Sequence, residues 1–308
     1  MGAVYRAEDC ASGRPVALKF VGANILFDAP RRERFLQGLL IASEIRHPGL
    51  CPILEIGDQD DDFFIVLPLL EGETLAEALR RGSLPWKDAL LIALAAGEAL
   101  AVVHAAGIAH RAFKPANIWL QEGNRVVLTD CCVARFTEIV NAEGGRTKEL
   151  RTGFADSVIP MNALAYMSPE QVRGDPVDCR SDVFAFGVVL YEILTGRHPF
   201  EARNSPSQMS AILEAHPVAP SMRKSGLPVI FDEVVLKALA KAPQMRYSSM
   251  QELMDILRKV SADEHALSHS SEAGDGKKTS VLLHVLGWSV AALLLMALSY
   301  WLIGTVFR

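Results

Sequence analysis

The stretch that decides the fold reads Asn162-Ala-Leu-Ala-Tyr-Met-Ser-Pro-Glu170, then Gln-Val-Arg-Gly-Asp-Pro-Val-Asp-Cys-Arg-Ser-Asp182, then Val-Phe-Ala-Phe-Gly-Val-Val-Leu-Tyr-Glu-Ile-Leu-Thr-Gly-Arg-His-Pro-Phe200. A second informative run, His110-Arg-Ala-Phe-Lys-Pro-Ala-Asn117, precedes it in the chain. At the N-terminus, residues 1–9 and 15–20 form two strand-like runs joined by a turn at Gly13. The order and spacing of these three regions carry the fold assignment.

In this order the three regions resemble the bacterial eukaryotic-like Ser/Thr protein kinases over roughly residues 1–258. The resemblance implies an α+β, two-lobed protein-kinase-like fold. Residues 1–70 are expected to form a small β-rich N-lobe that begins at the last glycine of the glycine-rich loop and lacks its first strand. Residues 71–258 are expected to form a helical C-lobe. Lys114 is the lysine typical of Ser/Thr kinases rather than tyrosine kinases.

The resemblance assigns structural roles to five residues of the C-lobe. Glu170 is expected to pair with Arg246, and Asp182 is expected to brace the backbone of the loop that contains His110 and Arg111. These residues predict that the C-lobe folds, but they do not indicate whether the protein catalyses phosphate transfer.

The resemblance also predicts a cleft that binds ATP and Mg²⁺. Lys19 is expected to reach the α- and β-phosphates, and Asn117 and Asp130 are the expected metal ligands. Pro68 keeps the carbonyl that adenine recognition uses at the segment linking the lobes, and the next amide required belongs to Leu70. The full set of expected ATP contacts is Gly2, Val4, Ala17, Lys19, Leu67, Pro68, Leu70 and Trp119.

Five positions depart from the family pattern in ways that affect catalysis. Ala112 stands where the family has the Asp that accepts the substrate proton, and a methyl group cannot do so. Gly38 stands where a Glu pairs with the nucleotide-binding lysine, and Glu33 and Glu44 point away from that face of the helix. Cys131-Cys132 replaces Phe-Gly after Asp130. The family's threonine before Ser168 is Ala163.

Three functions remain open on the sequence alone. The leading hypothesis is a membrane-tethered pseudokinase that binds nucleotide and acts in signalling as a scaffold or regulator of protein partners that the sequence does not name. The second is a weakly active Ser/Thr protein kinase, because positioning and electrostatics supply most of the catalysis in phosphoryl transfer. The third is a degraded domain that binds no nucleotide.

The C-terminal part of the chain predicts a membrane anchor. Residues 281–307 contain no Asp, Glu, Lys or Arg, and a helix of that length spans a bilayer core of about 30 Å. A buried helix of the preceding domain is the alternative. Residues 259–280 are polar and read as a flexible linker. Lys277 and Lys278 precede the span, which favours a single-pass protein of the cell membrane with the kinase-like domain in the cytoplasm.

The composition bears on two further possibilities, nucleic-acid binding and metal binding by cysteines. The 308 residues include 50% hydrophobic and 22% charged residues, and the net charge of −5 gives no indication of nucleic-acid binding. The five cysteines show no Cys-x-x-Cys spacing, so we expect reduced thiols and no cysteine-bound metal.

Overall fold

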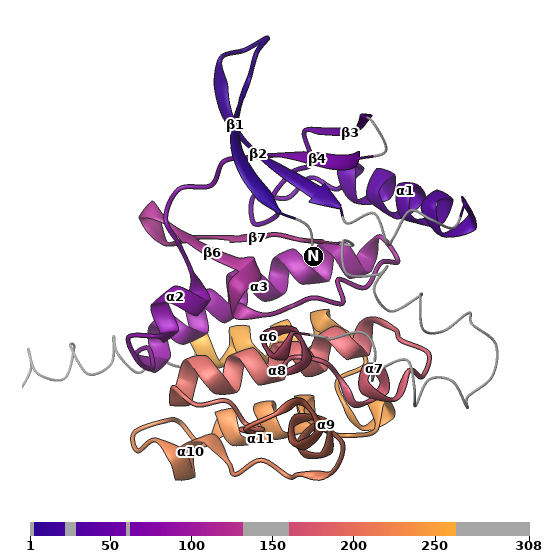
Figure 1. The fold of residues 1–308 in the computed structure, drawn as a ribbon. Coiled ribbons are helices and arrows are strands. Elements are labelled where there is room, and N and C mark those ends of the chain that lie inside the picture. Colours follow the sequence, from indigo (N-terminus) through magenta and orange to yellow (C-terminus); the bar gives the residue numbers. More distant parts are fainter. Residues whose placement is uncertain (1–2, 22–28, 60–61, 132–159, 263–308) are drawn as a thin grey trace, which may run out of the picture. The chain divides into compact units, whose positions relative to one another are not determined.

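The computed structural model describes residues 3–21, 29–59, 62–131 and 160–262. By its contacts the chain divides into two units, Met1–Leu257 and Arg258–Arg308. The predicted transmembrane helix at 281–307 lies outside the described residues, as do Gly2, Cys132 and most of the predicted linker. The first unit has the expected two-lobed arrangement of a β-rich part and a helical part (Figure 1).

The N-lobe is built on a four-stranded antiparallel sheet with the order β1-β2-β4-β3. The expected pair of N-terminal strands is present as β1 (Val4–Asp9) and β2 (Arg14–Val21). Their turn closes with a hydrogen bond from Gly13 N to the Asp9 carbonyl at 2.7 Å, and Gly13 adopts φ 68°. A side chain is disfavoured at that angle, which explains why the turn uses glycine. The other strands are β3 (Glu55–Gln59) and β4 (Asp62–Pro68).

One helix, α1 (Ala29–Glu44), accompanies this sheet (Figure 1). Leu39 of the helix is buried with Val21, Phe63 and Ile65 of the strands, so the N-lobe has its own apolar core. Gly38 is also buried, whereas Glu33 and Glu44 are exposed. The helix therefore presents no carboxylate from these two positions to the interior, as the helical spacing predicts.

A second, three-stranded sheet begins the C-lobe, with the order β5-β6-β7. Its strands are β5 (Glu73–Thr74), β6 (Ile118–Gln121) and β7 (Arg125–Leu128), and the short helices η2 (Pro115–Asn117) and η3 (Glu122–Asn124) flank β6. Helix α2 (Leu75–Leu79) follows β5 and begins with a capping box between Thr74 and Glu77, which satisfies the first amides of the helix.

Backbone contacts tie the segment between α1 and β3 to the second sheet. Leu50 and Leu128 form an isolated parallel bridge. Cys51 N donates to the Leu128 carbonyl at 2.9 Å, and Leu128 N donates to the Gly49 carbonyl at 2.8 Å. The segment that follows α1 is thus tied directly to β7 of the other lobe.

The C-lobe core surrounds helix α8 (Cys179–Thr195), which is buried on every side from Ser181 to Tyr191. A helix without a polar face is stable only inside a domain, and the uncharged run in this part of the sequence agrees with that position. Around it lie α3 (Trp86–Ala105), α11 (Ile230–Ala238) and helical residues 250–257 (Figure 1). The smaller helices are α6 (Met161–Leu164), α7 (Pro169–Arg173), α9 (Ser205–Glu214), α10 (Pro220–Arg223) and η4 (Pro243–Met245).

Helix α3 is long and apolar enough to cross a membrane, with a mean hydropathy of 1.7. It packs instead inside the C-lobe, where eight of its residues are buried. At Gly97 a β-carbon would meet the Sδ atom of Met254 at 2.3 Å, so the absence of a side chain lets residues 250–257 approach closely. Residues 259–262 are helical and continue this last helix beyond the boundary at 258 that the sequence predicts.

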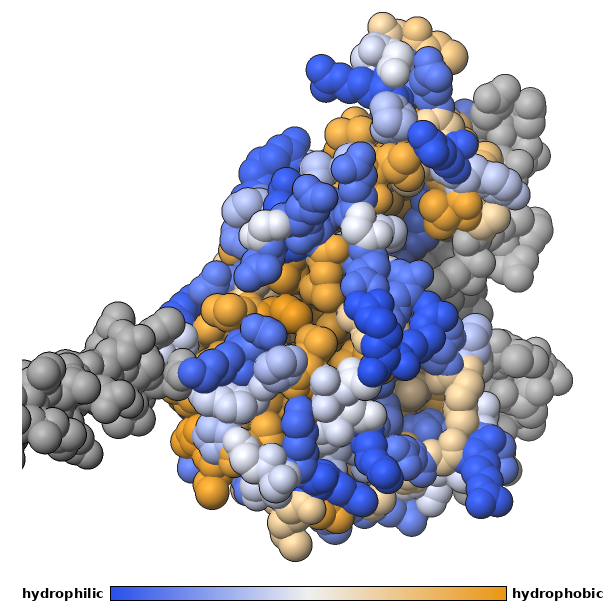
Figure 2. Space-filling view, turned by 90° about the vertical axis from the view of Figure 1, so that its left-hand side faces the viewer, coloured by the Kyte–Doolittle hydropathy of each residue, from blue (hydrophilic) through white to orange (hydrophobic). Residues whose placement is uncertain are grey.

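The described surface mixes hydrophilic and apolar side chains, as the face in Figure 2 shows. Large exposed apolar residues come from several elements, including Tyr5 of β1, Leu40 of α1, Met222 of α10 and Leu236 of α11. The exposed apolar area is therefore shared between both lobes.

Candidate functional site

The loop from His110 to Asn117 connects α3 to β6, and a buried carboxylate holds its backbone. Asp182, which is 0% exposed, accepts hydrogen bonds from His110 N and Arg111 N at 2.7 Å each and from His104 Nε2 at 2.9 Å. Arg111 adopts φ 64°, a conformation that is unfavourable for a residue with a side chain. The carboxylate supports this strained backbone, so the bracing role expected for Asp182 is present.

The ring of His110 links the loop to the end of β7. Its Nδ1 accepts a hydrogen bond from Ala112 N at 3.2 Å, and its Nε2 lies 2.9 Å from the Thr129 carbonyl. Because one nitrogen accepts and a carbonyl cannot donate, the contacts assign a neutral ring with the proton on Nε2. Burial lowers the pKa of His110, which agrees with the neutral form, while the charge of Asp182 acts in the opposite sense.

Asn117 holds the other side of the loop. Its Nδ2 donates to the Ala112 carbonyl at 2.9 Å, and its own carbonyl accepts from Thr129 N at 2.9 Å. The backbone of Ala112 is therefore fixed on both sides, by His110 and by Asn117. What the position lacks is only the carboxylate of the side chain.

Lys19 and Asp130 meet across the cleft between the lobes. Lys19 Nζ lies 2.5 Å from Asp130 Oδ1, and Lys19 is 5% exposed. Lys19 comes from the second half of β2, while Asp130 follows β7 and adopts φ 65°. The lysine whose expected helix partner is replaced by Gly38 thus pairs with the predicted metal ligand.

Lys114 is a second buried cation in this cleft, with 7% exposure. Its pKa is lowered by burial, while the nearby charge of Asp130 acts in the opposite sense and the charge of Lys19 acts in the same sense as burial. Both ammonium groups thus lie close enough to Asp130 to sense its charge. Asp130 is thus paired with Lys19 and lies near enough to Lys114 to act on its pKa.

The donor types at Asn117 and Asp130 are those that Mg²⁺ accepts, since this ion prefers oxygen ligands. In the structure, however, Lys19 Nζ forms an ion pair with Asp130 Oδ1. Among the described residues no three His, Cys, Asp or Glu side chains gather into a metal-binding group. As folded, the two residues do not fit a resident Mg²⁺, because the ion would have to displace an ammonium group from the carboxylate.

The residues expected to surround adenine come from neighbouring strands. Ala17 of β2 lies opposite Leu67 of β4, and Pro68 ends that strand opposite Val16. Val4 lies opposite Lys19 and is 60% exposed. Trp119 and Leu70 are half-buried, Trp119 on β6 and Leu70 after β4. The roles of these residues in adenine binding stay predictions.

Lys19 and Asp130 also line a cavity, and the sequence does not predict most of its other lining residues. The side chains at Ala42 and Cys131 are small where they face it, which is the one signal in the sequence that could have revealed it. Burial raises the pKa of the Cys51 thiol to about 12, and the charge of Asp130 acts in the same direction. The thiol is therefore protonated and unreactive at neutral pH. The lining residues are Lys19, Ala42, Ile45, Leu50, Cys51, Ile53, Ile65, Leu67, Asp130 and Cys131.

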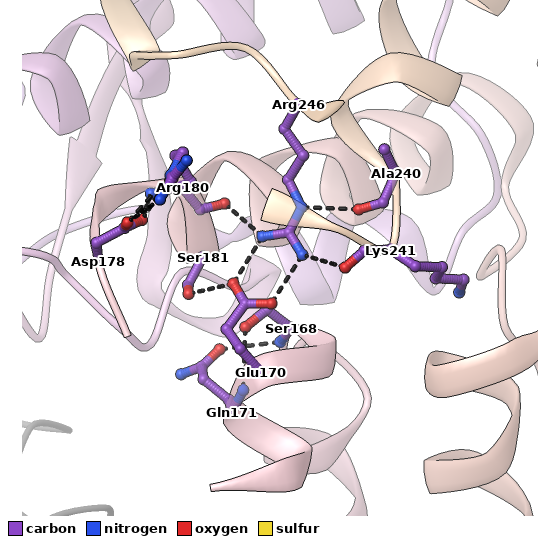
Figure 3. A network of polar contacts seen from close by, with 9 residues as sticks. All are labelled: Ser168, Glu170, Gln171, Asp178, Arg180, Ser181, Ala240, Lys241 and Arg246. Carbon is purple, nitrogen blue, oxygen red and sulfur yellow. Dashed lines mark hydrogen bonds and ion pairs between the residues drawn. The ribbon is translucent and has the colours of Figure 1, made fainter. Parts of the chain in front are cut away.

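The expected pair between Glu170 and Arg246 is present deep in the C-lobe (Figure 3). Arg246 Nη1 and Nη2 donate to Glu170 Oε1 and Oε2 at 2.6 and 2.7 Å. The guanidinium also donates to the carbonyls of Ala240, Lys241 and Arg180, so each of its three nitrogens has partners. Its five bonds connect α7, the start of α8 and the segment after α11.

Comparisons with known proteins agree with this architecture. Residues 1–259 match the protein kinase domain family. The chain is 35% identical over 264 residues to the serine/threonine-protein kinase PknB of Mycobacterium leprae, covering 84% of this chain and 41% of that protein. It is 33% identical over 292 residues to PknB of Mycobacterium tuberculosis, covering 93% of this chain and 45% of that protein. The chain thus spans less than half the length of these relatives.

The fold is also found among solved structures. The kinase domain of Mycobacterium tuberculosis PknI superimposes with a TM-score of 0.63, at 24% identity, covering 84% of this chain and 91% of that domain. A variant of the same domain gives a TM-score of 0.65 with 84% and 90% coverage. At this identity the likeness shows the two-lobed fold.

Proposed function

Because the chain belongs to the protein kinase family and its relatives are bacterial Ser/Thr kinases, we propose that it is a pseudokinase, which binds ATP and regulates or scaffolds signalling proteins with little or no phosphate transfer. Protein kinases use ATP and Mg²⁺ for transfer. This chain keeps the cationic part of that site, in Lys19 and Lys114, and has lost the group that accepts the substrate proton.

The main support for the proposal is that the loop around Ala112 keeps its backbone hydrogen bonds but lacks the carboxylate. Asp182, His110 and Asn117 hold its backbone through the hydrogen bonds described above. Because the loop is held in place, the loss of the carboxylate is not compensated by a rearranged neighbour within the described loop. Removing a general base lowers a rate by about 10²–10⁴.

Other substitutions act in the same direction. Lys19 has no carboxylate at Gly38 to hold it toward phosphates and pairs with Asp130 instead. Ala163 replaces a threonine hydroxyl and lies in α6, half-buried. These losses concern groups that work together, since a displaced lysine and a missing base each reduce the same step.

The proposal places the protein at the cell membrane, anchored once through residues 281–307, with the kinase-like domain in the cytoplasm. This part rests on the sequence alone, that is, on the uncharged run and the two lysines before it. The protein partners are unnamed by the sequence, and nucleic acid is not among the expected ligands.

The first prediction concerns phosphate transfer. The full chain, purified in detergent and incubated with radiolabelled ATP, Mg²⁺ and a general protein substrate, is expected to incorporate no label above the background of a heat-denatured sample. The physical reason is the missing base together with the engaged lysine. Transfer that Asp130→Ala abolishes would sink the proposal, because such a signal requires this site.

The second candidate function is a weakly active Ser/Thr kinase. It is favoured by the presence of Lys19, Lys114, Asn117 and Asp130 in one cleft, since positioning and charge stabilisation supply most of the rate in phosphoryl transfer. The two functions differ in their response to one substitution.

The discriminating change is Ala112→Asp. A weak kinase that lacks only its base is expected to gain about 10²–10⁴ in transfer rate, whereas the proposed pseudokinase stays inactive because Gly38 gives Lys19 no carboxylate on α1 and Ala163 has no hydroxyl. Ala116→Asp is the matched control, since Ala116 is an exposed residue of the same loop. A rate that rises with Ala112→Asp and not with Ala116→Asp decides for the kinase.

A further inference from the structure

The ion pair between Lys19 and Asp130 has a consequence for the ligand. We propose that the cleft binds a nucleoside triphosphate without a divalent cation, with Lys19 and Lys114 neutralising the phosphates in its place. This inference rests on the proposed function, because it specifies how the same site holds its nucleotide.

The first argument is competition for Asp130. A metal ion at this carboxylate must displace Lys19 Nζ, which lies 2.5 Å from Oδ1. The displaced ammonium would be left 5% exposed without a carboxylate on α1, because the buried position there is Gly38 and both Glu33 and Glu44 are exposed. Separating a buried ion pair and leaving one of its charges unpaired is strongly unfavourable.

The second argument is the balance of charge at the phosphate end of the cleft. Among the described residues, Lys19 and Lys114 contribute two buried ammonium groups and Asp130 contributes one carboxylate. The family has a further carboxylate at the position of Ala112, and in this chain a methyl group replaces it. The described part of this end of the cleft is therefore net positive before any metal binds, and a polyphosphate is attracted to it directly.

The third argument is that a phosphate group can take the place of Asp130 at Lys19, while the ammonium group of Lys114 stays near the released carboxylate. Both partners are anionic oxygens, and an ammonium bonded to either one forms a charge-assisted hydrogen bond. Mg²⁺, in contrast, gives up its waters reluctantly and would meet a carboxylate that is already engaged. The exchange of one anion for another is thus the easier reaction.

The test is a titration of the full 308-residue chain, in detergent, with the fluorescent nucleotide N-methylanthraniloyl-ATP. One series contains excess EDTA and the other contains excess MgCl₂. The expected result is binding in EDTA, with a Kd within about threefold of the value in MgCl₂, which is less than the tenfold that corresponds to about 1.4 kcal/mol.

A substitution of Asp130 changes the nucleotide affinity in opposite directions for metal-free and for metal-dependent binding. Asp130→Asn removes the anion that competes for Lys19, so it is expected to tighten binding in EDTA by about threefold or more, given that charges in partly buried sites interact strongly. A site that needs a metal ligand at this position predicts weaker binding. Asp175→Asn is the matched control, because Asp175 is exposed and lies outside the cleft.

The possible outcomes distinguish the metal-free binding inferred here from the nucleotide binding of the proposed function. Binding in MgCl₂ that disappears in EDTA overturns this inference and leaves the proposed nucleotide-binding function in place. Tighter binding in EDTA for Asp130→Asn supports the inference, and weaker binding counts against it. Absence of binding under both conditions overturns the inference together with the nucleotide binding of the proposed function, and decides for a degraded site.

Discussion

Replacing Arg246 by Ala is expected to lower the free energy of unfolding by about 3–5 kcal/mol, because the change leaves the buried carboxylate of Glu170 without its partner. The carbonyls of Ala240, Lys241 and Arg180 lose donors from the same side chain. Equilibrium unfolding in urea, followed by circular dichroism, measures the effect. A typical domain has only about 5–15 kcal/mol of stability, so this loss removes a large share of it and lowers the urea concentration at the midpoint.

The control is Arg81→Ala. Arg81 donates to both oxygens of Glu73 at 2.6 Å, which is the same bidentate geometry, but its side chain is 65% exposed. Exposed pairs contribute about 0–1 kcal/mol. Similar losses for Arg81→Ala and Arg246→Ala would show that burial does not decide the effect, contrary to our expectation.

The same pair predicts an acid dependence of the stability. Burial alone raises the pKa of Glu170, but the hydrogen bonds and charge of Arg246, with the hydroxyl of Ser181, leave the pKa below its ordinary value of 4.5. A lowered pKa in the folded state gives a contribution that is complete above pH 4.5 and is lost as the pH falls through the folded-state value. The difference in stability between the native chain and Arg246→Ala is therefore expected to shrink below pH 4.5.

Replacing Asp182 by Ala is expected to cost at least about 3 kcal/mol, because the backbone amides of His110 and Arg111 and the ring of His104 lose their acceptor, at about 1–3 kcal/mol for each buried group. Arg111 would also lose the support for its left-handed backbone. We expect a lower midpoint of urea unfolding and, at a denaturant concentration where the variant is still folded, weaker nucleotide binding.

Asp178→Ala is the control for this change. Asp178 is the N-cap of the same helix α8 and accepts from Arg180 N at 2.8 Å, but it is exposed. Losing an exposed cap costs about 0.5–2 kcal/mol. A loss of nucleotide binding for Asp178→Ala as large as that for Asp182→Ala would contradict the specific role of the buried carboxylate.

The sequence predicts those parts of the structure for which the local chemistry allows only one arrangement. Glu170 and Arg246 lie 76 positions apart, yet a charged side chain in an apolar lobe requires a partner, and the family pattern supplies it. The exposure of Glu33 and Glu44 follows from helical geometry alone. In both cases the local chemistry allows few alternatives.

The pair between Lys19 and Asp130 is different. The sequence shows that Lys19 has lost its helix partner at Gly38, but several anions could replace it, among them a phosphate. Which anion does so depends on how two lobes approach across 111 residues of chain. The cavity that this pair lines is a property of packing between elements, and neither Ala42 nor Cys131 predicts it separately.

The bridge between Leu50 and Leu128 bears on how the two lobes can move. By sequence the N-lobe ends near residue 70, yet the segment Gly49–Cys51 is hydrogen-bonded to β7 of the C-lobe. Any rotation that opens the cleft must therefore break these two bonds or leave this segment behind with the C-lobe. In the second case the chain bends at two places, after Cys51 and after Pro68, and the sheet of the N-lobe turns as a body smaller than the one that the sequence outlines.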